Sequence, residues 1–146
     1  MNTLKSILLV EDDRDDQIFF IEALSEIANV TLFHIANNGR EALEKLENSA
    51  ILPDLIFTDI NMPVMNGTEF LSAIIKNPYT RNIPVVVLTT STGEMDFVRR
   101  VGAKAFIKKP SDCKILRDKL EQVIGLDFNV DNHVANQTFQ LGYPGF

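Results

Sequence analysis

Short apolar runs alternate along this chain with longer segments in which apolar residues recur every three or four positions. The runs predict five buried strands, and the periodic segments predict five amphipathic helices. Asn, Asp, Gly and Pro lie between them and set most of the helix ends. The expected strands are 5–10, 30–35, 53–58, 84–88 and 104–107, and the expected helices are 15–28, 40–48, 66–77, 94–101 and 111–124.

A regular alternation of strands and helices is typical of an α/β fold with a parallel sheet covered on both faces. Right-handed crossovers restrict the possible topologies. We therefore expect residues 1–125 to form one flavodoxin-like, doubly wound (βα)5 three-layer sandwich. We adopt the strand order 2-1-3-4-5, the usual one for such a sheet, which brings the ends of the first and third strands together where ligands bind.

Two helices have especially clear apolar spacing. In the first helix the expected buried face comprises Ile18, Ile21, Leu24 and Ala28. In the last helix, capped by Ser111 or Asp112 and ended by Gly125, it comprises Ile115, Leu116, Leu120, Val123 and Ile124. These faces are expected to pack on the sheet.

The end of the chain differs in character. Residues 126–146 are rich in Asn, Gln and Gly, have no clean helical period, and place several aromatic residues close to the terminus. We expect a C-terminal tail that is either frayed or docked on its own domain or on a partner.

Composition narrows the class of protein. The net charge of −6 argues against non-specific binding to nucleic acid or to anionic membranes. No apolar run approaches the roughly 18 residues that a membrane span needs. Cys113 is the single cysteine, so a disulfide framework is excluded and a cytoplasmic location is expected. The two histidines and Cys113 have no partners at metal-ligand spacing and receive no role.

Four polar signals each follow a predicted strand, and in an α/β sheet such strand ends meet at one edge. They are Glu11-Asp12-Asp13, then Asp59, then Thr89 with Thr90-Ser91, and finally Lys109-Pro110. Each also has an ordinary interpretation, as a helix cap, a turn residue, a strand end and a solvated lysine. Their combination instead predicts a site that binds a divalent metal and accepts a phosphoryl group.

Crowded carboxylates repel one another unless a cation intervenes, and oxygen-rich sites suit Mg²⁺. Asp13 can alternatively cap the first helix, while Asp15 and Asp16 are interpreted as acids of its first turn that complement the helix dipole. An aspartate such as Asp59 can form a covalent acyl phosphate. Its neighbour Asn61 offers a main-chain carbonyl as a further metal ligand.

The remaining two signals suit the phosphoryl group itself. The Thr89 hydroxyl can donate to a phosphoryl oxygen, although Thr90 and Ser91 are rival donors. Lys109 can supply the countercharge, while Lys108 is expected to face away because side chains alternate along a strand.

With these residues together, the chain resembles the receiver domain of a two-component response regulator, of the stand-alone chemotaxis type. The resemblance covers about residues 4–125 and rests on Leu9-Val10-Glu11-Asp12-Asp13, on Asp59 with Met62-Pro63 and Gly67, on Thr89, on Gly102-Ala103 and on Lys109-Pro110. The stretch Leu88-Thr89-Thr90-Ser91, together with Glu11-Asp12-Asp13 and Lys108-Lys109-Pro110, is also similar to small regulators that partner phytochrome-type histidine kinases.

The resemblance implies a role for each matching residue. Asp59 is the phosphoacceptor, and Thr89 and Lys109 contact the phosphoryl group. The metal, Mg²⁺ with Mn²⁺ as a possible substitute, is held by Glu11, Asp12, Asp59 and the main-chain carbonyl of Asn61. Thr89 and Phe106 are the switch residues, and phenylalanine at that position lacks the hydroxyl that a tyrosine would present.

The implied function is phosphorelay signalling by conformational switching. A sensor histidine kinase or a histidine phosphotransfer protein donates the phosphoryl group, and an unidentified protein downstream receives the signal, with the regulator a monomer or a homodimer. The chain would not be an enzyme beyond promoting its own phosphorylation and dephosphorylation. The helix at 94–101 is shorter than usual for the family. The surface by which the family usually reads out phosphorylation is therefore not expected in its standard form.

Two other functions stay open. A receiver that only binds proteins, without phosphorylation, would need none of the site residues. A metal-dependent phosphatase would need a second acid near Asp59 to protonate a leaving group, but the residue two positions on is Asn61.

Overall fold

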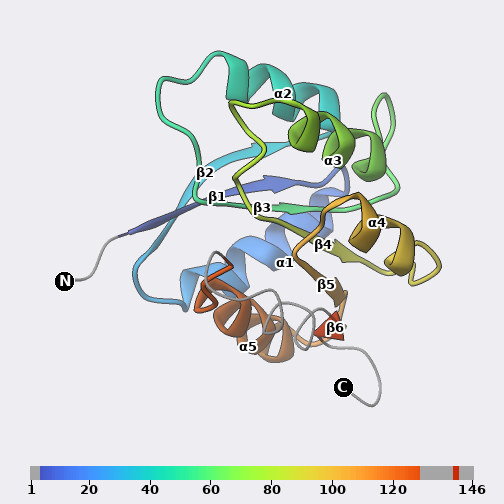
Figure 1. Cartoon of the computed structure of the whole chain (residues 1–146). Helices are drawn as coiled ribbons and strands as arrows, with labels where there is room; N and C mark the ends of the chain where they lie inside the picture. Colours follow the sequence, from blue (N-terminus) through green and yellow to red (C-terminus); the bar gives the residue numbers. More distant parts are fainter. Residues whose placement is uncertain (1–3, 129–139, 142–146) are drawn as a thin grey trace.

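Six parallel strands form the central sheet of the computed structural model, which describes residues 4–128 and 140–141 (Figure 1). Their order is β2-β1-β3-β4-β5-β6, so the predicted order of the first five strands is confirmed. The strands are β1 (Lys5–Val10), β2 (Val30–Ala36), β3 (Leu55–Thr58), β4 (Val85–Thr89), β5 (Ala105–Lys108) and β6 (Gln140–Leu141).

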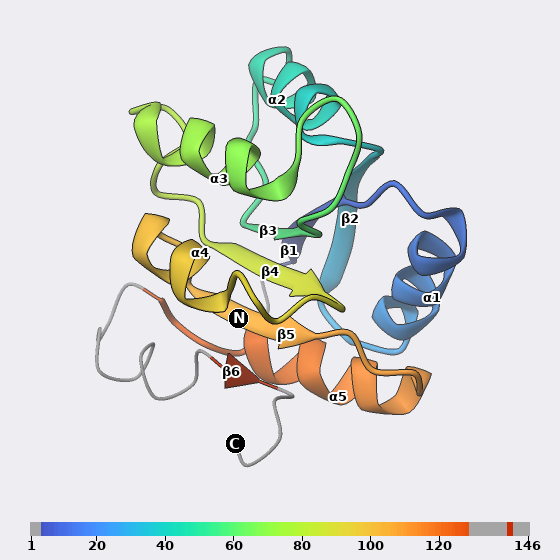
Figure 2. The same cartoon turned by 90° about the vertical axis from the view of Figure 1, so that its right-hand side faces the viewer.

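In the described part of the chain, five helices cover the two faces of this sheet, with α1 and α5 on one side and α2, α3 and α4 on the other (Figures 1 and 2). They are α1 (Arg14–Ser25), α2 (Gly39–Glu47), α3 (Gly67–Lys76), α4 (Met95–Val101) and α5 (Cys113–Ile124). Each face therefore has its own apolar core. None of the described helices combines the length and the apolar character that a membrane crossing requires.

The predicted buried face of α1 is wrong at most positions. Ile18 and Ile21 are 45% and 39% exposed, and α1 ends at Ser25, before Ala28. The helix instead turns Gln17, Phe20, Ala23 and Leu24 inward. The aromatic ring of Phe20 decides this orientation, because it packs edge-on against Phe57 of β3 at 5.3 Å between ring centroids.

Polar side chains at the helix starts explain why the elements begin where they do. Asp13, Asn38, Asn66 and Asp112 each accept a hydrogen bond from a backbone N–H in the first turn of α1, α2, α3 and α5. The interpretation of Asp13 as a cap is thus confirmed, and Asp112 is the cap of α5. Of the predicted apolar face of α5, Ile115 is 49% exposed, and the other four residues are buried as predicted.

The start of α3 bears directly on the site, because its first residue lies against the loop that follows β3. Asn66 accepts from the N–H of Glu69 at 2.9 Å, and the Glu69 carboxylate accepts from the N–H of Asn66 at 3.0 Å. This reciprocal pair satisfies two N–H groups that the helix itself leaves free. It ties the end of the loop to the helix.

Asn66→Ala should lower the free energy of unfolding by about 1 kcal/mol, because one of these bonds is lost at the helix start. Urea denaturation followed by circular dichroism measures the change. Asn82→Ala, at an exposed position outside the helices, is the matched control and should stay close to wild type. Equal stability of the two variants would contradict the assigned cap.

The tail contributes to the sheet at one place. Gln140 and Leu141 pair in parallel with Phe106 and Ile107, so β6 extends the predicted five strands beyond β5. At these two residues the tail pairs with its own domain. The other tail residues beyond Phe128 lie outside the described part of the chain, and the domain boundary at residue 125 stays a prediction.

Candidate functional site at the carboxyl ends of the strands

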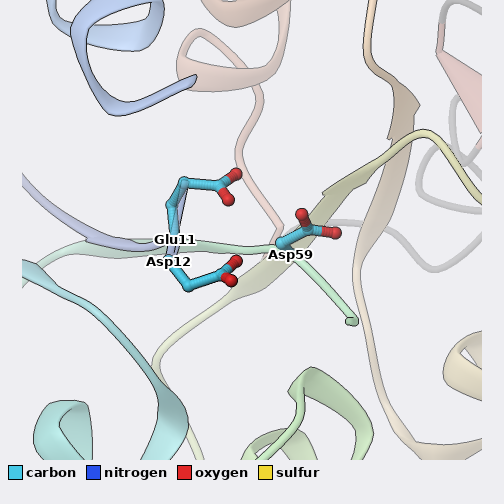
Figure 3. Close-up of side chains that lie close together, drawn as sticks. All are labelled: Glu11, Asp12 and Asp59. Atoms are coloured by element: carbon cyan, nitrogen blue, oxygen red, sulfur yellow. The ribbon is translucent and has the colours of Figure 1, made fainter. Parts of the chain in front are cut away.

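The register of the sheet brings the predicted site residues to one edge. Val10 and Thr58, the last residues of β1 and β3, are paired neighbours. The N–H of Asp59 donates to the carbonyl of Val10 at 3.0 Å. Glu11 and Asp12 follow β1 directly, so three carboxylates from two strand ends lie close together (Figure 3).

These carboxylates form the acidic cluster, defined as Glu11, Asp12 and Asp59. One oxygen of each lies within 4.8 Å of the others. Glu11 is 3% exposed and Asp59 is 9% exposed, whereas Asp12 faces solvent. Carboxylate oxygens converging in this way, with one side open to water, fit a hard divalent cation such as Mg²⁺. The residues present therefore fit a metal.

A lysine neutralises the buried side of the acidic cluster. The Lys109 ammonium lies 2.7 Å from Glu11 Oε1, 2.8 Å from Asp59 Oδ2 and 2.7 Å from Asp16 Oδ2. Lys109 thus points at the strand ends, while Lys108 is exposed. Asp16, interpreted from sequence as an acid of the first helical turn, is a member of the site that the sequence reasoning missed. Its position one turn after Asp12 was the available signal.

Burial and hydrogen bonding act in opposite directions on the pKa values of Glu11 and Lys109, and a different one of the two prevails at each residue. Burial raises the pKa of Glu11 to about 7, although its hydrogen bond to Lys109 works in the other direction. Burial alone would lower the pKa of Lys109, but hydrogen bonds to Asp16, Asp59 and Glu11 outweigh it and raise that pKa. Lys109 is therefore a permanent cation beside Asp59.

Three hydrogen bonds fix Asp59 and the residue that follows it. Its Oδ1 accepts from the N–H of Ile60 at 2.6 Å, and its carbonyl accepts from the Thr58 hydroxyl at 2.9 Å. The N–H of Gly67 donates to the carbonyl of Ile60 at 2.7 Å, and this contact brings α3 against the same loop. The aspartate is consequently fixed with one carboxylate oxygen on the backbone and the other on Lys109.

The other predicted residues lie around this centre. Thr89, fully buried at the end of β4, accepts from the N–H of Ser91 at 3.3 Å through its hydroxyl oxygen. Its carbonyl accepts from the N–H of Lys109 at 2.9 Å, which joins β4 to the lysine. Phe106 is fully buried in the core on the α2, α3 and α4 side. Asn61 is exposed in the loop after β3.

The short helix predicted before β5 is confirmed: α4 has seven residues, and no side-chain hydrogen bond caps its start at Glu94. The Ser91 hydroxyl donates to the Glu94 carboxylate at 2.6 Å and ties the loop after Thr89 to the helix. The site and the start of α4 are thus linked by a short polar loop.

Comparison with known proteins identifies the family. The model of the response regulator receiver domain matches residues 7–121. The chain belongs to this family. The receiver is a domain of two-component phosphorelay signalling, and the family is generally not enzymatic. The predicted family and its general function are therefore confirmed.

Relatives of this receiver differ in how much of them it spans. It is 31% identical to chemotaxis protein CheY1 of Helicobacter pylori over 121 residues, which cover 82% of this chain and 96% of that protein. It is 36% identical to a protein-glutamate methylesterase/protein-glutamine glutaminase of Geobacillus kaustophilus over 115 residues. That match covers 76% of this chain but only 31% of the relative.

Solved structures give the same fold. The phosphorylated cyanobacterial phytochrome response regulator RcpA superposes with a TM-score of 0.74 at 31% identity, covering 83% of this chain and 91% of that chain. The Mn²⁺-bound form of response regulator Rcp1 superposes with a TM-score of 0.72 at 30% identity, covering 88% and 97%. This receiver is accordingly similar to phytochrome response regulators as well as to chemotaxis regulators.

Proposed function

We propose that Asp59 of this receiver accepts a phosphoryl group from a phosphohistidine, carried by a sensor histidine kinase or by a histidine phosphotransfer protein. One observation carries the proposal. The Asp59 carboxylate lies between two other carboxylates and a partly buried ammonium 2.8 Å away. Phosphoryl transfer depends mainly on positioning and on neutralising charge, and this arrangement supplies both.

The metal in this proposal is Mg²⁺, with Mn²⁺ as a substitute. Glu11, Asp12, Asp59 and the main-chain carbonyl of Asn61 would hold it, and it would neutralise charge on the phosphoryl oxygens. The converging oxygens of the acidic cluster support this assignment. The Mn²⁺-bound form of the related Rcp1 supports the substitute.

The protein's own residues then have defined tasks. An Asp59 carboxylate oxygen attacks the phosphorus, the P–N bond to the donor imidazole breaks, and the imidazole nitrogen keeps the electron pair of that bond. The product is an acyl phosphate on Asp59. Lys109 donates hydrogen bonds to a phosphoryl oxygen as charge develops there, and the N–H of Ile60 holds the other carboxylate oxygen in place.

Lys109→Met should lower the rate of phosphoryl incorporation from acetyl phosphate about 100-fold, because it removes a preorganised donor to the developing charge. Initial rates measured by intact mass spectrometry at saturating Mg²⁺ give this ratio. Lys108→Met removes the same charge from the exposed neighbouring position and should react like wild type. Equal rates for the two variants would contradict the role of Lys109.

Signal output in this proposal passes through Thr89 and Phe106. The Thr89 hydroxyl would turn to the phosphoryl group, and Phe106 would change its packing between β5 and α4 as the switch between two states. The backbone bond from Lys109 to Thr89 and the burial of Phe106 support this route. An unidentified protein would read the change, and the receiver acts as a monomer or homodimer in the cytoplasm.

The test is incubation with acetyl phosphate, followed by intact mass spectrometry. One added phosphoryl group that forms with Mg²⁺, and fails to form with EDTA, is the expected result. The opposite result is a folded protein that shows no adduct, under conditions in which hydrolysis of the acyl phosphate is too slow to hide one. That result would favour a receiver that only binds proteins. Turnover of a generic phosphate ester would favour a metal-dependent phosphatase.

A further inference from the structure

Asp16 occupies a position in the site that no metal-binding role explains. Its carboxylate contacts Lys109 at 2.7 Å, yet it is outside the acidic cluster of Glu11, Asp12 and Asp59. We propose that Asp16 is a positioning residue, which keeps the Lys109 ammonium beside Asp59 while a divalent cation occupies the acidic cluster. This inference rests on the function proposed above.

Three carboxylates take up the hydrogen-bonding capacity of Lys109. An ammonium has three N–H donors, and here three carboxylates lie within 2.8 Å of it, from Glu11, Asp16 and Asp59. Two of these belong to the acidic cluster. A divalent cation would therefore draw on the same carboxylates that hold the lysine.

Two cations that share Glu11 and Asp59 also repel each other across a largely buried site, where charge interactions are stronger than in water. Lys109 would then keep one carboxylate that the metal does not use, that of Asp16. This carboxylate is well placed for the task, because the N–H of Asp16 donates to the capping side chain of Asp13 at 3.0 Å. The first turn of α1 thus fixes the anchor.

A small cavity next to Lys109 offers space into which its side chain can move. A cavity of about 30 Å³ is lined by Lys109, by the acids Glu11 and Asp16, and by apolar residues such as Phe19, Leu88 and Leu116. A space of this size accepts about one water molecule. A lysine without its anchor can therefore shift away from Asp59 without displacing packed side chains.

The direct test measures the position of Lys109 rather than activity. Reductive methylation of the folded protein is followed by peptide mass spectrometry, with exposed Lys108 in the same stretch as the internal reference. In wild type we expect slow labelling of Lys109 with and without Mg²⁺. In Asp16→Asn, labelling should stay slow without metal and rise roughly tenfold on adding Mg²⁺. Asp15→Asn removes the same charge one residue away and should label like wild type.

Kinetics give the second readout. Asp16→Asn should lower the maximum rate of phosphorylation roughly tenfold, a loss typical of a displaced catalytic group, with little change in the Mg²⁺ concentration for half-maximal rate. Asp16→Glu should restore much of the rate. In the Lys109→Met background Asp16→Asn should have no further effect, because the two residues act as one unit.

These outcomes separate this inference from the proposed function. If wild type is phosphorylated but Asp16→Asn matches Asp15→Asn in both Lys109 labelling and maximum rate, the positioning role is overturned while the phosphoacceptor role stands. If wild type is not phosphorylated, the proposed function fails, and the Mg²⁺-dependent exposure of Lys109 still decides whether Asp16 anchors the lysine.

Discussion

Asp59→Asn is expected to abolish phosphoryl incorporation while leaving the fold intact. The amide lacks the anionic oxygen that attacks phosphorus, so no acyl phosphate can form at this position. The amide oxygen can still accept the N–H bond from Ile60, which holds the side chain in the native structure. Replacing one of several crowded carboxylates also reduces their mutual repulsion, so stability should not fall.

Labelling with acetyl phosphate and Mg²⁺, read by intact mass, measures this loss. Asp54→Asn is the matched control, since Asp54 is an exposed acid before β3, at the opposite end of the same strand. It should be labelled at the wild-type rate. Labelling of Asp59→Asn to the level of Asp54→Asn would show that the acceptor lies elsewhere.

Gly67→Ala is expected to cause the largest loss of stability, about 3 kcal/mol or more in the free energy of unfolding. A Cβ at this position would overlap the main-chain oxygen of Asp59 and lie 2.8 Å from Cα of Ile60. Both obstacles are backbone, so neither can swing aside as a side chain would. Relief of the clash requires moving the loop that holds Asp59, and phosphorylation should also fall.

Gly93→Ala provides the comparison, because a Cβ there meets no atom within 4 Å. Urea denaturation should place Gly93→Ala near wild type and Gly67→Ala well below it. If the two variants unfold at the same urea concentration, the close approach of α3 to the loop after β3 does not contribute to the stability of the fold as we propose.

Most of the site follows from the sequence, for a simple reason. Parallel strands end at one edge of the sheet, so Glu11, Asp12, Asp59 and Lys109 meet whatever the details of side-chain packing. The position of each strand end is visible as an apolar run that stops at a polar residue. The roles assigned to these residues stay predictions, as do the ligand role of Asn61 and the switch roles of Thr89 and Phe106, because all of them concern a bound metal or phosphoryl group.

The predictions from sequence are wrong or incomplete where side-chain packing and non-local contacts, rather than the local sequence pattern, determine the structure. The first helix offers apolar residues on two overlapping faces, and the contact of Phe20 with Phe57 selects the one that leaves Ile18 exposed. Asp16 has the ordinary pattern of an acid in a first helical turn, and its contact with Lys109 depends on a residue 93 positions away. The pairing of Gln140 with Phe106 is equally non-local.

The most direct test of the central claim identifies the modified atom. Protein phosphorylated with acetyl phosphate is treated with borohydride, which reduces an aspartyl phosphate to homoserine, and peptides are then sequenced by mass spectrometry. We expect homoserine at position 59 alone, formed only when Mg²⁺ was present. An adduct that resists borohydride, or homoserine at another aspartate such as Asp12 or Asp16, would contradict the assignment of Asp59 as the phosphoacceptor.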